Sequence, residues 1–208
     1  MAAPESALLA LGIGIALSAA CGFRIMIPLV AISLGARAGE LHLASDFSWM
    51  ASDLALGIFL VGMVCEICAY YIPAVDNFLD TIASPAALIA GTIVTASMIQ
   101  DMSPMLRWTL AVIAGGGAAG LVQAKTVVVR ALSTLTTGGL GNPIVASGEL
   151  AGAAAVSALA IFVPGLAIFG AVCLLVATGF ALRWAWKKLR SSRSAAQVAD
   201  NTQDTRVT

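Results

Sequence analysis

The chain has 208 residues, of which 60% are hydrophobic and only 11% are charged, and its formal net charge is zero. Soluble domains carry about 25% charged residues, and the mean hydropathy here is +0.96. These values exclude an ordinary soluble protein and predict one integral membrane domain over residues 1–186, with membrane lipids and no nucleic acid as partners.

The first apolar stretch, near residues 7–36, contains a buried-looking cation, Arg24. Because about 20 residues cross a bilayer, this stretch is over-long. It is either a tilted or broken helix or a hairpin that dips into the membrane and returns, and Pro28 is the predicted break. An arginine costs roughly 2.5–3.5 kcal/mol at the bilayer centre, so Arg24 is expected to face protein or water.

The second helix is predicted near residues 53–73 and carries Glu66 well inside its apolar sequence. A carboxylate there needs a cation or a proton, and Arg24 or Lys125 is the expected partner. Cys65 and Cys68 have CxxC spacing, but without further ligands they predict helix packing and no metal site.

The third helix is predicted at 85–100, after a boundary segment that contains Asp76. Asp76 and Asp80 share one face if that segment is helical, because they are four residues apart. Asp76 is therefore included among the candidate binding residues.

The fourth stretch, near residues 105–135, is also over-long, and it carries Lys125. Superimposing Arg24 on Lys125 also places Gly14 on Gly115. This match predicts two three-element repeats, about 7–100 and 105–186. Three crossings in each repeat would make the repeats inverted, with the cationic site near the midplane, whereas hairpins in the over-long stretches would make the repeats parallel.

The last two helices are predicted at 149–163 and 165–186. Arg130, Asn142 and Glu149 lie around the turn before the first of these. Asn142 belongs to a glycine-rich turn, and Glu149 is either an acid favoured by a helix N-terminus or a member of the site.

The C-terminal tail, residues 187–208, begins with a basic cluster and is predicted to end in disorder because its composition is polar. Five basic residues follow the last apolar run, and by the positive-inside rule they place the C-terminus in the cytoplasm. These are Arg183, Lys187, Lys188, Arg190 and Arg193. We expect a multi-pass protein of a bacterial inner membrane.

Several of these residues resemble the motifs of domain-of-unknown-function family 4126, small integral membrane proteins of bacteria and plants. The resemblance covers roughly residues 10–185. Tyr71 is a departure, since a lysine often stands there in the family. The motif residues matched in this chain are Gly22, Phe23, Arg24, Pro28, Leu29, Glu66, Ile72, Pro73, Asp76, Lys125, Arg130, Asn142, Pro143, Ser147 and Glu149.

The sequence thus predicts an all-α polytopic bundle of six membrane elements whose function is transport or conduction of an anion or a lipid headgroup. The alternative is an accessory protein in which the buried charges only fix helix packing. No catalytic set, metal set or cofactor motif is found, so we expect no enzyme. A homodimer stays open, because small residues recur at helix-packing spacing. The predicted substrate-binding residues are Arg24, Glu66, Asp76, Lys125, Arg130, Asn142 and Glu149.

Overall fold

The computed structural model describes the backbone of residues 4–100 and 102–204, and the side chains of these except 4–6, 73–80, 185 and 188–204. The described chain is all-α, as predicted. Its elements are α1 (Pro4–Cys21), α2 (Met26–Arg37), the 3₁₀ helix η1 (Ser45–Ala51), α3 (Asp53–Tyr70), α4 (Pro73–Met98), α5 (Pro104–Leu110), the π segment η2 (Ala111–Gly116), α6 (Gly117–Thr137), α7 (Asn142–Phe162) and α8 (Pro164–Asp204).

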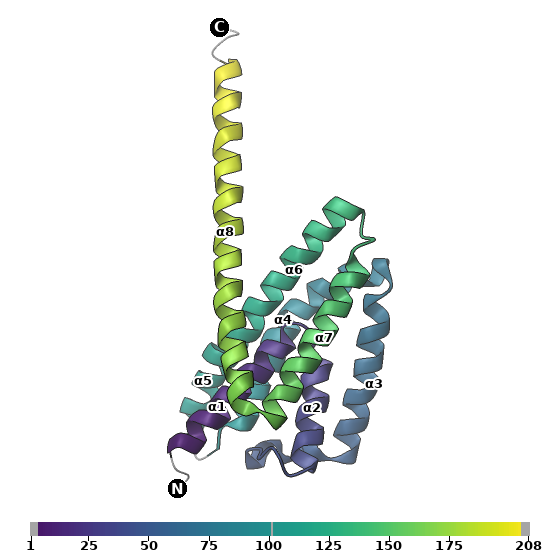
Figure 1. The fold of residues 1–208 in the computed structure, drawn as a ribbon, viewed down its shortest axis with the longest axis vertical. Coiled ribbons are helices and arrows are strands. Elements are labelled where there is room, and N and C mark those ends of the chain that lie inside the picture. Colours follow the sequence, from purple (N-terminus) through teal and green to yellow (C-terminus); the bar gives the residue numbers. More distant parts are fainter. Residues whose placement is uncertain (1–3, 101, 205–208) are drawn as a thin grey trace.

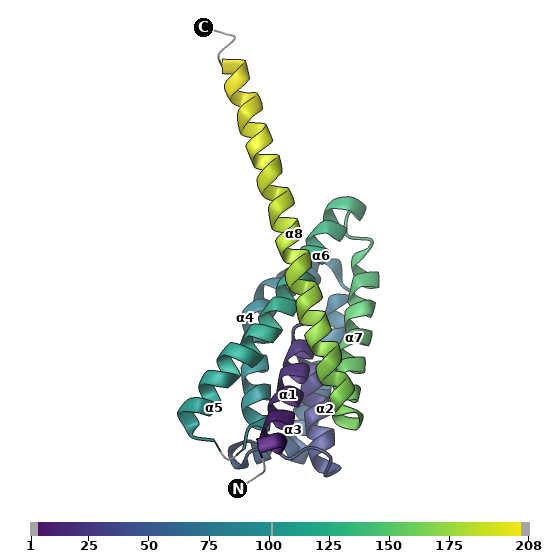
Figure 2. The same ribbon diagram turned by 60° about the vertical axis from the view of Figure 1, so that its left-hand side comes forward.

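Five helical segments of the described chain are long and apolar enough to cross a membrane, and the protein is therefore a multi-pass membrane protein. They are α3, the second part of α4, the continuous α5–η2–α6, α7 and the first part of α8. The start of α1, η1 and the α7–α8 turn lie at one end of the bundle, here called the N-terminal end (Figure 1). The α3–α4 turn, the α6–α7 turn and the C-terminus of α8 lie at the opposite, C-terminal end (Figure 2).

The first over-long stretch is a hairpin of two short helices that enters the bundle and returns to the same end (Figure 1). Two hydrogen bonds tie the segment after α2 to the end of α4: Ala44 N donates to Ser97 O at 2.8 Å, and Gln100 Nε2 donates to His42 O at 2.6 Å. With 12 residues, α2 is only about 18 Å long, too short for a bilayer core of about 30 Å. The sequence left open whether this stretch is a tilted or broken helix or a hairpin, and the structure shows the hairpin.

The hairpin turns at residues 22–25. Pro28, just after the turn, favours the break in the helix, and Gly22 allows the close packing. The ring of Pro28 would clash with the carbonyl of Arg24 in a continuous helix, whereas in the first turn of α2 its missing N–H costs nothing. Gly22 lies so close to α6 that a Cβ there would be 2.6 Å from Val122 Cβ and 3.0 Å from Gln123 N. The turn can therefore pack directly on the α6 backbone.

The second over-long stretch does not fold in the same way. Its helix runs continuously from Pro104 to Thr137, through Gly115 and Gly116 at the end of the π segment. Lys125 therefore lies within a helix, whereas its predicted counterpart Arg24 lies in a turn. The internal duplication stays a prediction.

Small residues bring α1, α4 and α6 together in the core. Ser18 Oγ donates to Gly91 O at 2.6 Å, and a Cβ on Gly91 would be 2.6 Å from Ala119 Cβ. Gly116 and Gly120, four residues apart, both face α4. Backbones this close are characteristic of membrane helices, in which packing replaces the hydrophobic driving force between helices.

Polar contacts fasten η1 at the N-terminal end. Arg107 Nη2 donates to Asp46 Oδ2 at 2.6 Å, and Arg37 Nη2 lies 2.6 Å from Asp53 Oδ1. The hydrogen bond from Arg107 holds the pKa of Asp46 below its ordinary value. Both cations at this end of the described chain are thus paired with carboxylates.

Three predicted boundaries differ from the structure. Helix α4 begins at Pro73 and not at Pro85, because proline fits the first turn of a helix and membrane helices also tolerate an internal proline. Helix α7 begins at Asn142, with Pro143 in its first turn. Helix α8 continues to Asp204 where disorder was predicted, since residues 181–204 include many good helix formers and no glycine or proline.

Candidate functional site

The turn of the α1–α2 hairpin places the Arg24 guanidinium inside the bundle, near its C-terminal end. The side chain is buried, with 1% of its surface exposed. Arg24 Nη2 donates to Ala146 O at 3.1 Å and lies 4.0 Å from Glu149 Oε2, both on α7. Among the described residues, neither Nε nor Nη1 of Arg24 has a hydrogen-bond partner. Three of its five N–H donors are therefore unused.

A second buried arginine, Arg130 on α6, forms an ion pair with Glu149. Its Nε donates to Glu149 Oε1 at 3.3 Å, and its Nη2 donates to Oε2. Two donors on two carboxylate oxygens make a side-on pair, the geometry that arginine favours with carboxylates. Glu149 thus lies in the N-terminal part of α7 and is also the partner of a buried arginine.

The ring of Tyr70 contacts both guanidinium groups. The Arg24 Cζ atom is 3.7 Å from the ring centroid and the Arg130 Cζ atom is 4.3 Å from it. Each contact is a favourable cation–π interaction. Sequence reasoning missed Tyr70. The available signal was its spacing of four residues from Glu66, which places both on one face of α3.

Glu66 has different partners from those predicted. Its Oε1 accepts from Ile25 N and its Oε2 from Met26 N, each at 3.0 Å. The first amides of a helix lack intrahelical acceptors and lie at the positive end of its dipole. A carboxylate placed there accepts their hydrogen bonds, and these bonds stabilise its negative charge as a cation would. Glu66 thus caps α2 through its hydrogen bonds, and its predicted partner Arg24 attracts it electrostatically without a direct hydrogen bond among the described contacts.

Lys125 lies beside the hairpin turn but binds an aromatic ring. Its Nζ atom is 4.6 Å from the ring centroid of Phe23, and the residue is partly buried. Arg24 and Lys125 thus approach the same turn through different contacts. The described ion pairs of the cluster involve Arg24 and Arg130.

The remaining predicted residues flank the cluster. Asn142 is buried at the start of α7, and its Nδ2 donates to Thr134 Oγ1 on α6 at 3.2 Å. Asp76 is in the first turn of α4, and its side chain lies outside the described residues.

The cluster lies nearer to the C-terminal end than to the middle of the bundle. Arg130 is seven residues before the end of α6, and Glu149 is seven residues after the start of α7. At 1.5 Å per residue both are about 10 Å from those ends, and Tyr70 is the last residue of α3. The predicted midplane position is therefore displaced, because the hairpin extends beyond the middle of α3.

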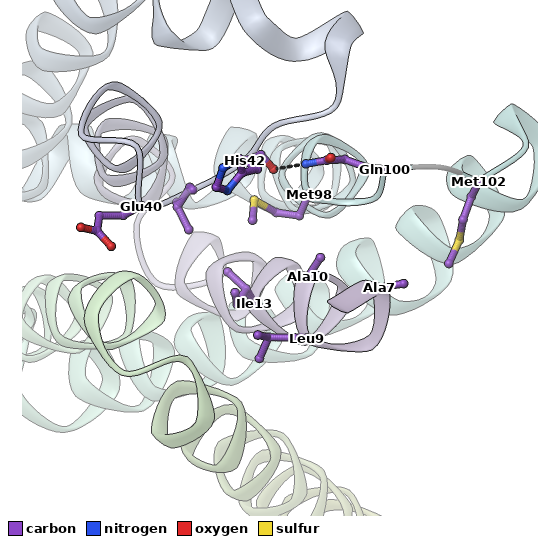
Figure 3. Close-up of a pocket in the computed structure, with 10 residues that line it drawn as sticks. Ala7, Leu9, Ala10, Ile13, Glu40, His42, Met98, Gln100 and Met102 are labelled. Atoms are coloured by element: carbon purple, nitrogen blue, oxygen red, sulfur yellow. Dashed lines mark hydrogen bonds between the residues drawn. The ribbon is translucent and has the colours of Figure 1, made fainter. Parts of the chain in front are cut away.

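A separate cavity of about 400 Å³ lies at the N-terminal end, between α1 and the segments around residues 40–42 and 98–102. Figure 3 shows His42 and Met98 on its lining, while Glu40 points away from them. No group of three metal-ligating side chains occurs among the described residues.

The fold and the buried charges define a class of protein: a polytopic membrane bundle with a re-entrant hairpin and arginines inside. The chain belongs to the family described as Domain of unknown function (DUF4126), whose model matches residues 11–184. No curated protein matches the chain, and no solved structure does.

Proposed function

We propose that the protein is a small transporter or channel for an anionic solute or an anionic lipid headgroup, and that Arg24 binds this anion. The observation that carries the proposal is the buried guanidinium of Arg24 at the tip of the hairpin, with Nε and Nη1 unsatisfied among the described residues. Buried donors without acceptors are unfavourable, and an oxyanion would supply the acceptors.

The charge balance of the described side chains supports an anion as ligand. The cations are Arg24, Arg130 and Lys125. Glu149 is shared by the two arginines, while both oxygens of Glu66 accept from backbone amides. Among the described residues no carboxylate oxygen lies within hydrogen-bond distance of Arg24, so an anion at its unused donors would reduce the cost of keeping this charge away from water.

The orientation that we propose follows from the basic residues of α8. Residues Arg183 and Lys187, with Lys188 and those that follow, favour a cytoplasmic C-terminal end. Because the hairpin returns to its own side and five segments can cross, the N-terminus is then outside. Six crossing elements, as the sequence predicts, would instead place both termini on the same side.

The orientation predicts asymmetric labelling of single cysteines introduced near each terminus in a cysteine-free protein. In intact cells, a membrane-impermeant thiol reagent should label Ala2→Cys and leave Thr208→Cys unlabelled until the cells are opened. The opposite pattern, or equal labelling of both positions, would contradict the orientation.

Transport can be tested in vesicles that contain the purified protein. We expect phosphate, sulfate or a carboxylate to cross faster than in protein-free vesicles. Arg24→Gln should slow this flux roughly tenfold to a hundredfold, the worth of a charge-assisted hydrogen bond of about 1.5–3 kcal/mol. The matched control is Arg37→Gln, which removes an arginine paired at the surface of the same hairpin and should leave the flux near wild type.

The alternative function is structural, and the completed Arg130–Glu149 pair and the Glu66 cap favour it. In that case Arg24→Gln lowers the melting temperature, and folded wild-type protein moves none of the anions above the protein-free rate. That pair of results would overturn the transport proposal.

A further inference from the structure

An apolar groove runs along α2, between α3 and α7, on the side of the hairpin away from the bulk of α1. It has a volume of about 340 Å³, within the range of small-ligand sites. Its walls are aliphatic, from Ile27 on α2 and Met63 on α3 to Ala158 on α7. Two lining residues carry polar side chains, namely Glu40 and Ser157.

The groove opens on an apolar outer surface of the bundle. Both α3 and α7 are among the segments able to cross a membrane, and large apolar side chains beside the groove are exposed, with Leu34 at 49% and Phe162 at 76%. Along α2 the lining extends from Ile27 to Ala38, which is about 16 Å. This length is roughly half of the hydrocarbon core of about 30 Å, the depth that the chains of one leaflet fill.

Ser157 is the second observation that points to a ligand. The residue is 2% exposed, and its Oγ has no hydrogen-bond partner among the described residues. It lies five residues before Phe162, the last residue of α7, hence about 8 Å along that helix from the N-terminal end of the bundle. The interfacial layer of a bilayer is about 5–8 Å thick on each side, so an ester carbonyl of a glycerolipid lies at a matching depth.

Glu40 determines the charge at the open end. It is exposed, and Figure 3 shows it directed away from His42 and Met98. Arg37, one turn earlier, is already paired with Asp53. A headgroup at this position therefore meets a carboxylate, which favours a cationic amine.

We propose that this groove binds one diacyl phospholipid with an amine headgroup. The ammonium lies beside Glu40, an ester carbonyl accepts from Ser157 Oγ, and one acyl chain continues from there along the groove toward Ile27. The lipid enters from the leaflet at the N-terminal end and satisfies the buried hydroxyl. The site is separate from the arginine cluster and does not depend on the proposed transport.

Native mass spectrometry of the full chain in micelles tests the proposal. The micelles contain equal amounts of diacyl phosphatidylethanolamine, its diether analogue and diacyl phosphatidylglycerol, all with similar chains. We expect a single retained lipid, with the diacyl amine lipid enriched. Ala158→Phe fills the groove and should reduce retention roughly tenfold. Ala155→Phe, on the same helix but outside the groove lining, should retain the lipid.

Two conservative variants test the polar contacts in protein that keeps its apolar walls. Ser157→Ala should abolish a roughly two- to tenfold preference for the ester over the ether lipid, the worth of one neutral hydrogen bond. Glu40→Gln should abolish the preference for the amine headgroup. Equal retention by the two phenylalanine variants would overturn the site. A lipid-free dimer that Ala158→Phe dissociates would show instead that a second copy covers the groove.

Discussion

Replacing Glu149 with alanine is expected to lower the free energy of unfolding by about 3–5 kcal/mol. The carboxylate accepts two hydrogen bonds from Arg130 and lies 4.0 Å from Arg24 Nη2. All three side chains are buried. Without Glu149, both guanidinium groups remain in a low-dielectric interior with like charge, and neither has this counter-ion. Unfolding by denaturant in detergent micelles, followed by tryptophan fluorescence, measures the loss.

Asp53 supplies the matched control for Glu149. Its ion pair with Arg37 is short, at 2.6 Å, but the Asp53 side chain is 91% exposed. Water already solvates both charges there, so Asp53→Ala should cost far less than Glu149→Ala. In a double-mutant cycle, Glu149→Ala combined with Arg130→Met should recover part of the lost stability, because one buried cation is removed together with its partner. Equal losses of stability for Glu149→Ala and Asp53→Ala would refute a buried-pair role for Glu149.

The second large effect is expected at Glu66. Glu66→Ala removes the acceptor of two amides at the start of α2, those of Ile25 and Met26. Each amide left without a partner in this part-buried site costs about 1–3 kcal/mol, so we expect a loss of about 2–6 kcal/mol in the same unfolding experiment. Glu66→Gln keeps one acceptor oxygen and should lose about half as much.

A cap at the surface is the control for Glu66. Ser52 Oγ accepts from Ala55 N at 3.2 Å at the start of α3, where the residue is exposed. Ser52→Ala should cost about 1 kcal/mol, the usual worth of a cap. If Glu66→Gln were as stable as wild type while Glu66→Ala were not, one hydrogen bond would suffice, and the second amide would contribute nothing.

Helix positions were the most predictable part of the fold. The limits of α3 at Asp53–Tyr70 and of α2 at Arg37 are close to the predicted ones, since long apolar runs in lipid must satisfy their backbone as helices. The start of α4 was not predictable, because the boundary sequence before Pro85 is polar enough to be read as a loop. Whether the chain at Arg24 crosses the membrane or turns back was also open, because a crossing helix and a hairpin have the same apolar composition.

Within the candidate site, the type of residue was predictable and the pairing was not. Arg24, Glu66 and Lys125 stand out because ionisable groups are rare within apolar sequence. Their partners depend on which helix ends meet. Tyr70 was missed, because an aromatic residue at the end of an apolar helix carries no charge signal of its own.

By itself, the sequence determined that the chain enters a membrane, that its apolar segments are helical, and that a few buried charges need partners. These conclusions follow from transfer energies, which depend on residue type and segment length. Only the tertiary structure decided that the chain at Arg24 turns back, that Glu66 caps α2, and that Glu149 joins two arginines. Those contacts join residues 19 to 125 positions apart, and their geometry depends on helix packing, which no local pattern encodes.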